Sequence, residues 1–600
     1  MTDLRSAARE QHPRPDFVRR WWQSLDGTWA FAFDDQDEGL KAGWQKEDVA
    51  LPQRIQVPFV YQCESSGIGV ADYHPILWYQ RSFELPAEVS GQRILLRFGA
   101  VDYACQVWLN GQMVGSHRGG YAAFALDITP FMRPGENDLR LRVVDHRDTA
   151  QPRGKQYWED GLMGCWYTPS SGIWQSVYLE ALGDTGIDAI YITPDIDQYV
   201  ARVAVDLDRD PEEGLCLEYE LRFEGRLVRR VTSELPFKRY EISLDMRDAS
   251  RVDSLRLWSP GHPNLYDLVL RLKRGDQLLD EVATYFGMRK VEHRGGHVLL
   301  NNTPIYQRLI LDQGYWPESL LTPPDGEALK RDVEYIKAFG FNGVRKHQKI
   351  EDPRFYYWCD RLGLLCWGEL PSAYEFCSDA MVNLTEEMMA FIRRDYNHPS
   401  IIAWVPLNES WGVREIYGNL QQQAFSDMLY KLCKAMDQSR LVSGNDGWEQ
   451  TLTDIVAIHD YASNGEDISK HFADRGEVER SFASWRMSFA KGYEPEEAFE
   501  EPFMLTEYGG IAMTIKGAQG QMENMETWGY HDKVDSEEAF FLRYRSLTDA
   551  IRALPYCRGF CYTQLTDVMQ EINGLLLPDR TPKVDPARFA QYNRNPEGYN

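Results

Sequence analysis

Apolar and polar residues alternate in short runs over the first part of the chain. Between residues 21 and 182, runs such as "LDGTWAFAFD", "WYQRSFELP" and "NDLRLRVVD" repeat with a period of two, as strands with one buried face do. Asn110 and Gly111 stand between two such runs, and this pair favours a hairpin turn. We therefore predict a jelly-roll-like β-sandwich over residues 1–185.

A second strand-rich stretch follows over residues 186–290. It contains "YITPDI", "ARVAVDLD", "LEYELRFEG", "EISLDM" and "LYDLVLRLKRG", again separated by turn residues. About a hundred residues of such strands suit an immunoglobulin-like β-sandwich. The stretch has no pair of cysteines to link its sheets.

After about residue 291 strands are separated by helices, which indicates parallel βα units. In "GEALKRDVEYIKAFG" the apolar residues share one helical face, and Gly340 is placed to end that helix. Eight parallel strands close a (β/α)₈ barrel, which we predict for residues 291–600. The eight strands are expected at about 305–311, 341–345, 364–369, 401–407, 440–444, 455–459, 503–507 and 558–563.

Two of these strands are apolar runs that end in a glutamate. The fourth, "IIAWVPLNES", delivers Glu409, and the seventh, "FMLTEYGG", delivers Glu507. Barrel strands are buried on both faces and their C-terminal ends form one rim, so both carboxylates are expected there. A carboxylate pair over such a cavity is the equipment of glycoside hydrolysis.

These segments resemble those of glycoside hydrolase family 2, the β-galactosidase, β-glucuronidase and β-mannosidase family. "RRDYNHPSIIAWVPLNES" is similar to the family's acid/base segment and "FMLTEYGG" to its nucleophile segment. Further matches, such as "VWLNGQMVGSHRGGYAAFALDITP", "LWSPGHPNLYDL" and "YTQLTDVMQEINGLLLPDRTPKVD", cover nearly the whole chain. The order of sandwich, immunoglobulin-like domain and barrel is also that of the family.

The resemblance implies an exo-acting, retaining β-glycosidase. Glu409 would be the general acid and then base, with a raised pKa, and Glu507 the ionised nucleophile. Asn408 would hydrogen bond the 2-hydroxyl of the sugar, and Tyr461, at the end of strand six, would lie near the nucleophile.

Further sugar-binding candidates lie at other strand ends. They are Arg345 and His347 after strand two, Asp312 after strand one, Glu369 after strand three and His459 in strand six. Arg345 has an alternative role as a salt bridge that locks barrel carboxylates. Asp160 resembles the aspartate that the family lends from the first sandwich to the barrel. Nearby Trp158 and Trp166 are either sugar-stacking platforms or core residues.

The identity of the sugar is left open. By family analogy a β-galactoside is the first choice, with β-glucuronide, β-galacturonide and β-mannoside as alternatives. The asparagine-x-lysine clamp of the best-known glucuronidases is absent, because Leu575 stands at the lysine position after Asn573. Four cations near predicted strand ends leave a uronic acid open, although surface solvation is an alternative role for each: Arg308, Lys346, Lys349 and Lys516.

Charge and composition limit the other partners. The net charge of −26 repels phosphate backbones and anionic lipid, so neither nucleic acid nor a membrane is expected as a partner. The ten scattered cysteines form no metal or redox motif, and the N-terminus has no apolar leader segment. If Met1 is native, a cytoplasmic protein with reduced thiols is predicted.

Other classes of function fit the sequence less well. The 12 histidines include no HxH or HExxH arrangement, so we expect no metal among the catalytic groups. No cofactor is required, and whether Mg²⁺ assists is left open. A non-catalytic carbohydrate-binding protein is the alternative of another class, and a homo-oligomer is compatible with the sequence.

Overall fold

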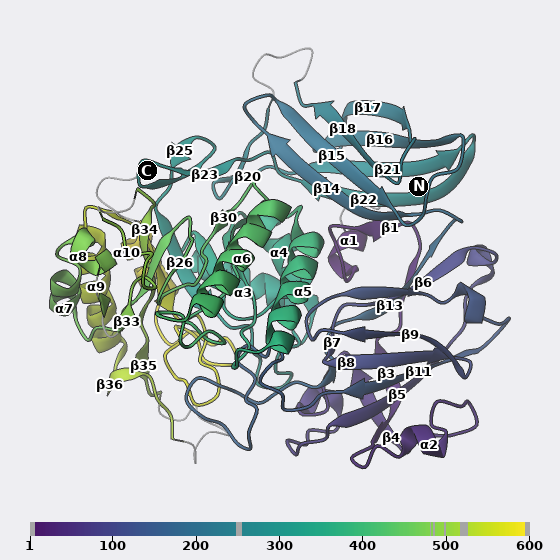
Figure 1. Ribbon diagram of the computed structural model, residues 1–600, viewed down its shortest axis with the longest axis horizontal. Coiled ribbons are helices and arrows are strands. Elements are labelled where there is room, and N and C mark those ends of the chain that lie inside the picture. Colours follow the sequence, from purple (N-terminus) through teal and green to yellow (C-terminus); the bar gives the residue numbers. More distant parts are fainter. Residues whose placement is uncertain are drawn as a thin grey trace.

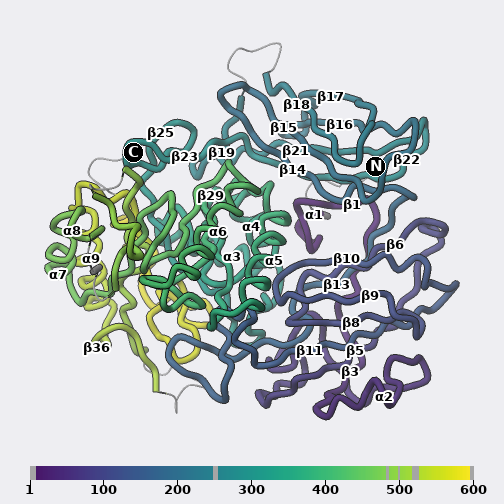
Figure 2. Tube along the Cα trace, viewed as in Figure 1, coloured from purple at the N-terminus to yellow at the C-terminus, as the bar shows by residue number. Residues whose placement is uncertain are grey.

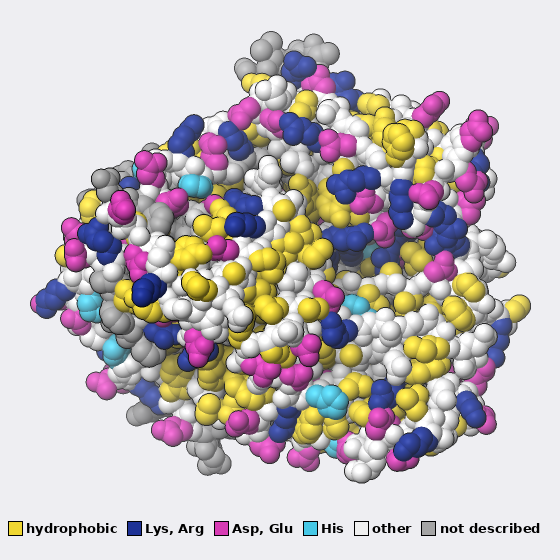
Figure 3. Space-filling model, viewed as in Figure 1, with side chains coloured by type: hydrophobic (Ala, Val, Ile, Leu, Met, Phe, Trp, Pro, Cys, Tyr) yellow, Lys and Arg dark blue, Asp and Glu magenta, His cyan; other side chains and the backbone are white. Residues whose placement is uncertain are grey.

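The computed structural model describes residues 7–247, 255–480, 482–483, 486–496, 500–515 and 526–594. Two β-sandwiches lie beside a barrel, which is drawn in green and yellow in Figure 1. On the face seen in Figure 3, acidic and basic side chains are interspersed. The predicted fold class, two sandwiches followed by a (β/α)₈ barrel, is confirmed.

The first sandwich packs a six-stranded sheet on a four-stranded sheet. The turn between β8 and β9 is the predicted hairpin, with Asn110 and Gly111 at φ 52° and 75°, the left-handed conformation that a two-residue loop favours. The first sheet has the order β4 (Gln53–Val57), β3 (Gly27–Phe33), β5 (Ile76–Phe83), β11 (Asn137–Val144), β8 (Ala104–Leu109), β9 (Gln112–Arg118). The second has the order β10 (Phe124–Asp127), β6 (Arg93–Phe98), β13 (Val177–Leu182), β2 (Trp22–Ser24).

The second sandwich is also made of two antiparallel sheets. One has the order β14 (Ile187–Asp195), β15 (Val200–Leu207), β18 (Arg239–Asp245). The other has the order β1 (Val18–Arg19), β22 (Gln277–Phe286), β21 (Tyr266–Arg274), β16 (Leu215–Phe223), β17 (Arg226–Glu234). Inward side chains of both sheets form one apolar core, as in other aligned sandwiches.

The strand β1 departs from the sequence prediction, which includes it in the first sandwich. Val18 lies opposite Ala283, at the edge of a sheet of the second sandwich. This two-residue pairing joins distant parts of the chain, so no local pattern could indicate it. Figure 2 shows the N-terminal segment, in purple, where the two sandwiches and the barrel meet.

Arg19 in β1 joins the two sandwiches through a buried ion-pair cluster. Its guanidinium contacts Glu180 of the first sandwich and Asp280 of the second, the latter at 3.2 Å. All three side chains are almost fully buried. Burial alone would raise the pKa of Glu180, but Arg19 and Arg97 lower it to about 2. Glu180 and Arg19 are therefore both charged at neutral pH.

The barrel has eight parallel strands within a few residues of the predicted positions. Their order is β30 (Leu441–Val442), β29 (Ile401–Val405), β28 (Leu365–Glu369), β27 (Gly343–Lys346), β26 (Gln307–Asp312), β37 (Cys557–Thr563), β34 (Phe503–Gly509), β31 (Val456–His459). The first and eighth strands, β26 and β37, pair directly. Beyond β30, Gly447 forms a bridge to Ile458 of β31, and the ring closes there.

Helices surround the barrel in Figure 1. The first of them starts at an Asp325 side chain that accepts a hydrogen bond from the Ala328 amide, and Gly340 follows its end at φ 84° as predicted. The helices are α3 (Gly326–Ala338), α4 (Pro353–Leu362), α5 (Ser378–Asp395), α6 (Leu420–Met436), α7 (Gly465–His471), α8 (Arg475–Arg480), α9 (Glu537–Ala553) and α10 (Pro586–Arg594). Among the described residues, no helix has the length and apolar character needed to cross a bilayer.

Short elements complete the chain. A small sheet of β23 (Val291–Arg294), β24 (His297–Leu300) and β25 (Thr303–Pro304) precedes the barrel, and β35 (Ile511–Met513) with β36 (Tyr530–Val534) follows β34. The others are α1 (Ala7–Gln11), α2 (Gly39–Ala42), β7 (Val101–Asp102), β12 (Gly172–Ile173), β19 (Trp258–Ser259), β20 (His262–Pro263), β32 (Phe482–Ala483), β33 (Arg486–Met487) and the 3₁₀ turns Glu64–Ser66, Ala87–Val89 and Thr129–Phe131.

Replacing Arg19 with methionine is expected to destabilise the protein by about 4 kcal/mol, because two buried carboxylates lose their cation. Chemical denaturation measures the change, with Arg20→Met, an exposed neighbour, as the control. Equal stability of the two variants would show that the buried cluster does not hold the sandwiches together.

Candidate active site

The two glutamates meet at the C-terminal rim of the barrel. One carboxylate oxygen each of Glu409 and Glu507 and one ring nitrogen of His459 lie within 4.8 Å of one another. The side chains of Glu409 and Glu507 are 16% and 6% exposed, so both line a nearly closed site.

The backbone turns sharply to present Glu409. Glu409 and Ser410 both adopt the left-handed conformation, at φ 50° and 54°. This conformation costs on the order of 1 kcal/mol for each residue that has a Cβ. The turn is held because the Glu409 amide donates to the Asp446 carbonyl at 2.9 Å and the Ser410 amide to Asn445 Oδ1 at 3.0 Å. The backbone after the strand is thus strained, and these hydrogen bonds stabilise the conformation that points the Glu409 carboxylate into the site.

Arg345 occupies the centre of the site. Its guanidinium is fully buried and contacts Glu507 Oε1 at 2.7 Å and Glu369 Oε2 at 2.8 Å. It also donates to Asn408 Oδ1 at 2.6 Å. The side-chain Nδ2 of Asn408 is buried and has no hydrogen-bond partner among the described residues. Arg345 therefore fixes the amide so that its N–H group stays available.

His459 bridges Glu409 and Asp446. Nδ1 lies 2.9 Å from Glu409 Oε1 and Nε2 lies 2.8 Å from Asp446 Oδ1. Burial lowers the pKa of His459, but the charge of Glu507 and the hydrogen bonds to Asp446 and Glu409 outweigh it and raise the pKa to about 9. His459 is therefore an imidazolium at neutral pH, donating from both nitrogens.

This cation changes the expected ionisation of Glu409. The sequence prediction is a raised pKa, and burial does act in that direction. The hydrogen bond and charge of His459 dominate, however, and leave the pKa of Glu409 below its ordinary value. For Glu507 burial is likewise outweighed by His459 and Arg345, and its pKa is lowered. In the free protein both glutamates are carboxylates.

Tyr461 supports Glu507 from strand six. Its hydroxyl donates to Glu507 Oε2 at 2.6 Å and lies 3.1 Å from Thr563 Oγ1. The ring stacks on Tyr530 of β36, with centroids 3.4 Å apart. Each oxygen of Glu507 thus has one strong donor, Arg345 for one and Tyr461 for the other.

His347 and Glu369 lie beside Arg345. His347 Nδ1 is 3.1 Å from Glu369 Oε1 and 3.9 Å from Glu507 Oε1, and burial lowers the pKa of this histidine. Burial raises the pKa of Glu369 to about 8 although Arg345 opposes the shift. The structure thus brings together Glu409, Glu507, Asn408, Tyr461, Arg345, His347, Glu369 and His459.

Asp312 lies outside this group. Residues of a strand alternate between faces, so Lys346, next to the inward Arg345, points away from the barrel interior. Asp312 pairs with Lys346 in register, and their charged groups lie 2.7 Å apart in a fully buried ion pair. Asp312 is therefore engaged by Lys346, and its contact with sugar stays a prediction.

Of the four cations considered for binding a uronic acid, the three described ones are not found at the two glutamates. Lys346 and Lys349 both pair with Glu351, at 2.7 and 2.8 Å. Arg308 lies near the start of β26, at the opposite end of the strand from the rim. Lys516 lies outside the described residues.

Asp160 pairs with a cation of the first sandwich. Its side chain is 92% exposed and lies 2.7 Å from Arg147. Its contact with sugar stays a prediction. Trp158 and Trp166 of the same loop are half-buried and belong to an aromatic cluster with Tyr374 and Trp411 of the barrel, with ring centroids 4.3 to 5.7 Å apart. They are therefore not fully buried core residues, and stacking on a sugar stays a prediction.

Sequence reasoning missed four residues near the site. Asp446 follows the predicted fifth strand, so the strand-end rule could have found it. Tyr530 begins the short strand β36, and Glu571 and Lys155 come from loops, where no periodic pattern marks a position. Lys155 belongs to the first sandwich's loop and is buried next to the barrel rim.

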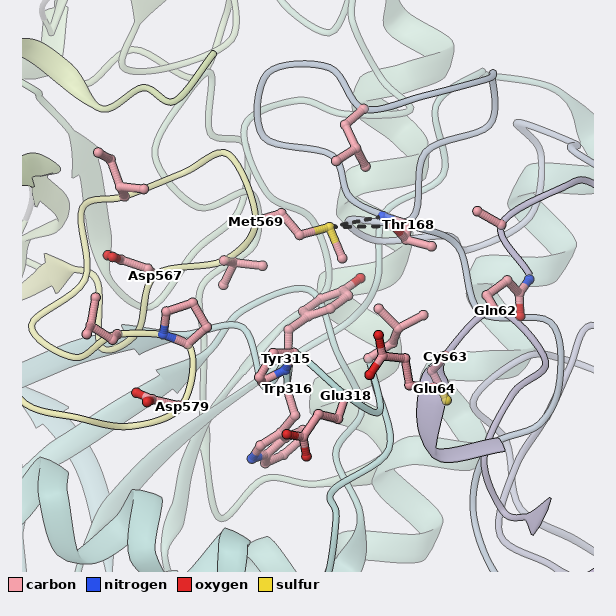
Figure 4. A pocket seen from close by; sticks show the side chains of 18 of the residues that line it. Gln62, Cys63, Glu64, Thr168, Tyr315, Trp316, Glu318, Asp567, Met569 and Asp579 are labelled. Atoms are coloured by element: carbon pink, nitrogen blue, oxygen red, sulfur yellow. Dashed lines mark hydrogen bonds between the residues drawn. The ribbon is translucent and has the colours of Figure 1, made fainter. Parts of the chain in front are cut away.

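A cavity of about 550 Å³ lies between the first sandwich and the barrel (Figure 4). Its lining includes Glu64 from the sandwich and Trp316, Asp567 and Met569 from the barrel, but neither Glu409 nor Glu507. The cavity is therefore distinct from the site of the two glutamates.

The close group of Glu409, His459 and Glu507 is also a possible donor set for a metal ion. Mg²⁺ prefers oxygen ligands, so a set containing an imidazole does not fit it. A transition metal would require a neutral His459, whereas both ring nitrogens face carboxylates in hydrogen-bond geometry.

Asp312→Asn tests the placement of Asp312 outside the site. The variant weakens one buried ion pair, while Lys346 keeps Glu351, so the free energy of unfolding should fall by about 2 kcal/mol. Hydrolysis of a cleaved glycoside should change less than about threefold. A large loss of hydrolysis at unchanged stability would return Asp312 to the sugar site.

Comparison with known proteins relates all three parts of the chain to glycoside hydrolases. Models of three glycosyl hydrolase family 2 domains match the chain: the sugar-binding domain at residues 22–182, the family 2 domain at 185–289 and the TIM barrel domain at 323–589. The β-galactosidase of Thermoanaerobacter pseudethanolicus is 26% identical over 73% of this chain and 58% of its own length. The β-galactosidase of Enterobacter cloacae is 25% identical, over 96% and 56%. The chain thus spans little more than half the length of these relatives.

Solved structures show the same fold. The β-glucuronidase of Ruminococcus gnavus superposes with a TM-score of 0.76 at 23% identity, covering 96% of this chain and 98% of that one. The β-glucuronidase of an uncultured Clostridium species has a TM-score of 0.75 at 21% identity, with the same coverage. Because family 2 models match all three parts of the molecule, the chain belongs to glycosyl hydrolase family 2.

Proposed function

We propose that this protein is a retaining β-glycosidase that removes terminal sugars. The observation that carries the proposal is the approach of Glu409 and Glu507 oxygens to within 4.8 Å. Retaining enzymes hold their carboxyl groups about 5 Å apart, whereas inverting enzymes leave roughly 6.5 to 9.5 Å for a water molecule. The spacing leaves no room for that water.

Glu507 is assigned as the nucleophile. Arg345 and His459 keep its carboxylate ionised although it is buried, and Tyr461 orients the second oxygen. One Glu507 oxygen attacks C1 of the sugar, the C1–O bond breaks, and a covalent glycosyl-enzyme forms. Water then attacks C1, releases the sugar and restores the carboxylate.

Glu409 is assigned as the acid and base, with His459 as the group that stores its proton. In the free protein the proton lies on Nδ1 of His459, hydrogen bonded to Glu409 Oε1. The charge of Glu507 is the main effect that raises the pKa of His459. As Glu507 loses that charge to the bond with C1, the proton passes through Glu409 to the leaving oxygen. The proton that water gives to Glu409 in the second step restores the imidazolium.

Asn408 is assigned to the sugar 2-hydroxyl. Its Oδ1 is held by Arg345, and its buried Nδ2 has no partner among the described residues. A buried amide N–H without an acceptor is costly, so an acceptor on the substrate would be favourable there.

A β-galactoside is the first substrate to test, because the curated relatives above are named β-galactosidases. β-Glucuronide, β-galacturonide and β-mannoside remain alternatives within the family. A cytoplasmic location is proposed from the ten cysteines, all of them free thiols.

Substitution of each glutamate tests these roles on a panel of p-nitrophenyl β-D-glycosides. Glu507→Ala and Glu409→Ala should each lower kcat by on the order of 10⁴ on the glycoside that the wild type cleaves. Azide should restore Glu507→Ala with an inverted glycosyl azide and Glu409→Ala with a retained one. Sugar binding without hydrolysis by the wild type would instead favour the non-catalytic alternative.

The stored proton makes the reaction sensitive to alkaline pH. The kcat/KM of the wild type should fall as pH rises through about 9, where His459 deprotonates. His459→Gln should lose this alkaline decrease in kcat/KM and be about 10²-fold slower at neutral pH.

His459 should also make the stability of the fold depend on pH. Because its pKa in the folded protein exceeds the ordinary 6.5, the stabilisation by His459 is full below pH 6.5 and lost by about pH 9. Thermal unfolding of the wild type and of His459→Gln between these pH values measures this stabilisation. An unchanged alkaline decrease in kcat/KM for His459→Gln would contradict the role of His459 as the proton store.

A further inference from the structure

The loop that carries Lys155 is fastened to the barrel rim. The amides of Arg153 and Gly154 donate to the Ser372 carbonyl at 2.9 and 3.0 Å, and the Tyr374 hydroxyl donates to the Gly154 carbonyl. The Ser372 backbone amide in turn donates to the side-chain oxygen of Gln348, and the Gln348 backbone amide donates to Glu369 of the site. Lys155 therefore has a fixed position beside the group around Arg345.

Gly154 makes this close approach feasible. It adopts φ 59°, and a Cβ there would lie 2.4 Å from the Gln348 carbonyl oxygen. Any other residue would push the loop away from the rim. On the other side, the Tyr167 amide donates to the Lys155 carbonyl at 2.8 Å, which holds the backbone of Lys155 itself.

Lys155 is a buried residue, and its ammonium has no anionic partner among the described residues. Its residue is 8% exposed, and no described carboxylate oxygen lies within the 4 Å of an ion pair. The Cys165 thiol is its hydrogen-bonding neighbour, and a thiol is a weak acceptor. An ammonium has three donors, so a single weak acceptor leaves donors free for an acceptor on a ligand.

The two carboxylates whose charges act on this ammonium, Glu571 and Glu409, are already bonded to other groups. Glu571 accepts from the Tyr167 hydroxyl on one oxygen and from Asn573 Nδ2, at 2.9 Å, on the other. Glu409 is bonded to His459. Burial would lower the pKa of Lys155, yet Cys165, Tyr374, Glu571 and Glu409 together raise it, so the cation persists at neutral pH.

We propose that Lys155 binds an anionic group of the substrate sugar, the carboxylate of a uronic acid or a sulfate ester. This inference rests on the proposed glycosidase function and names the substrate class of the same site. Both groups offer oxygens that can accept the ammonium's hydrogen bonds and neutralise its charge. The first sandwich, rather than the barrel, would then supply the cation that selects the substrate.

A competing role for Lys155 is to tune Glu409 alone, and the two roles have different consequences. A cation that binds the substrate's charge acts only on anionic substrates. A cation that acts through Glu409 affects every glycoside equally and shifts the pH profile. Pairs of glycosides that differ only in charge therefore separate them.

The experiment compares wild type, Lys155→Met and Lys155→Arg on three p-nitrophenyl β-D-glycosides of one configuration: galactoside, galacturonide and 6-sulfogalactoside, with the glucoside and glucuronide as a second pair. The wild type should prefer an anionic member. Lys155→Met should lose about 10²-fold in kcat/KM on that substrate and change less than about threefold on the neutral one, while Lys155→Arg retains part of the preference. Lys41→Met, at an exposed lysine of the same sandwich, is the matched control.

The outcomes on these substrates decide the proposal. An equal loss on charged and neutral glycosides, with a shifted pH profile, would overturn it in favour of tuning Glu409. A wild type that prefers the neutral member would overturn it as well. Between the anionic members, the larger Lys155-dependent preference identifies carboxylate or sulfate.

Binding separates this proposal from the proposed catalysis. Calorimetric titration of Glu507→Gln with free galacturonate and galactose needs no turnover. Binding of the acid that is lost in the double variant with Lys155→Met supports the inference even if no glycoside is cleaved. Equal binding in both variants contradicts it, and Lys155→Gln serves if Lys155→Met fails to fold in thermal unfolding.

Discussion

The buried guanidinium of Arg345 is the contact on which the site depends. It holds Glu507, Glu369 and Asn408, which come from three different barrel strands, through directions set by one rigid planar group. Without a cation a carboxylate buried to this extent would take up a proton, and Glu507 could not act as a nucleophile. The same contact turns the Asn408 amide so that its N–H group faces away from Arg345. One residue at the end of β27 therefore sets ionisation and orientation together.

His459 complements Arg345 with a charge that can move. Arg345 is always protonated, so it can only hold anions in place. The imidazolium of His459 lies between two carboxylates, Glu409 at Nδ1 and Asp446 at Nε2, and the charge of Glu507 helps to keep it protonated. In the proposed mechanism, the ionisation of Glu507 is thereby coupled to the proton that Glu409 passes on. Two cations of different acidity serve positioning and proton transfer separately.

Much of the fold and the centre of the site follow from local sequence pattern. Continuous apolar runs between amphipathic helices gave the eight strands, and strand ends indicated Glu409, Glu507 and Arg345, since a parallel barrel gathers those ends on one rim. Asp312 shows where this reasoning stops. Whether a residue at a strand end points into or out of the barrel depends on the register of its strand with the neighbouring strand. Here Asp312 pairs with Lys346, and this register cannot be deduced from the sequence of one strand. The placement of β1 failed for a related reason, because docking between domains involves residues far apart in sequence.

Lys155, like β1, could not be predicted from local sequence pattern, and in our proposal it determines the choice of substrate. Its position results from contact between two domains, with Gly154 pressed on the Gln348 carbonyl and the loop bonded to Ser372. The chemistry of bond cleavage resides in strand ends that every barrel of this design must keep in place. The loop of the separate sandwich contributes none of these strand ends, so its side chains can change without replacing Arg345, Glu409 or Glu507. Selection of the sugar can therefore diverge through the sandwich while the barrel keeps its reaction, and for this reason the glycone is poorly predicted from the barrel motifs alone.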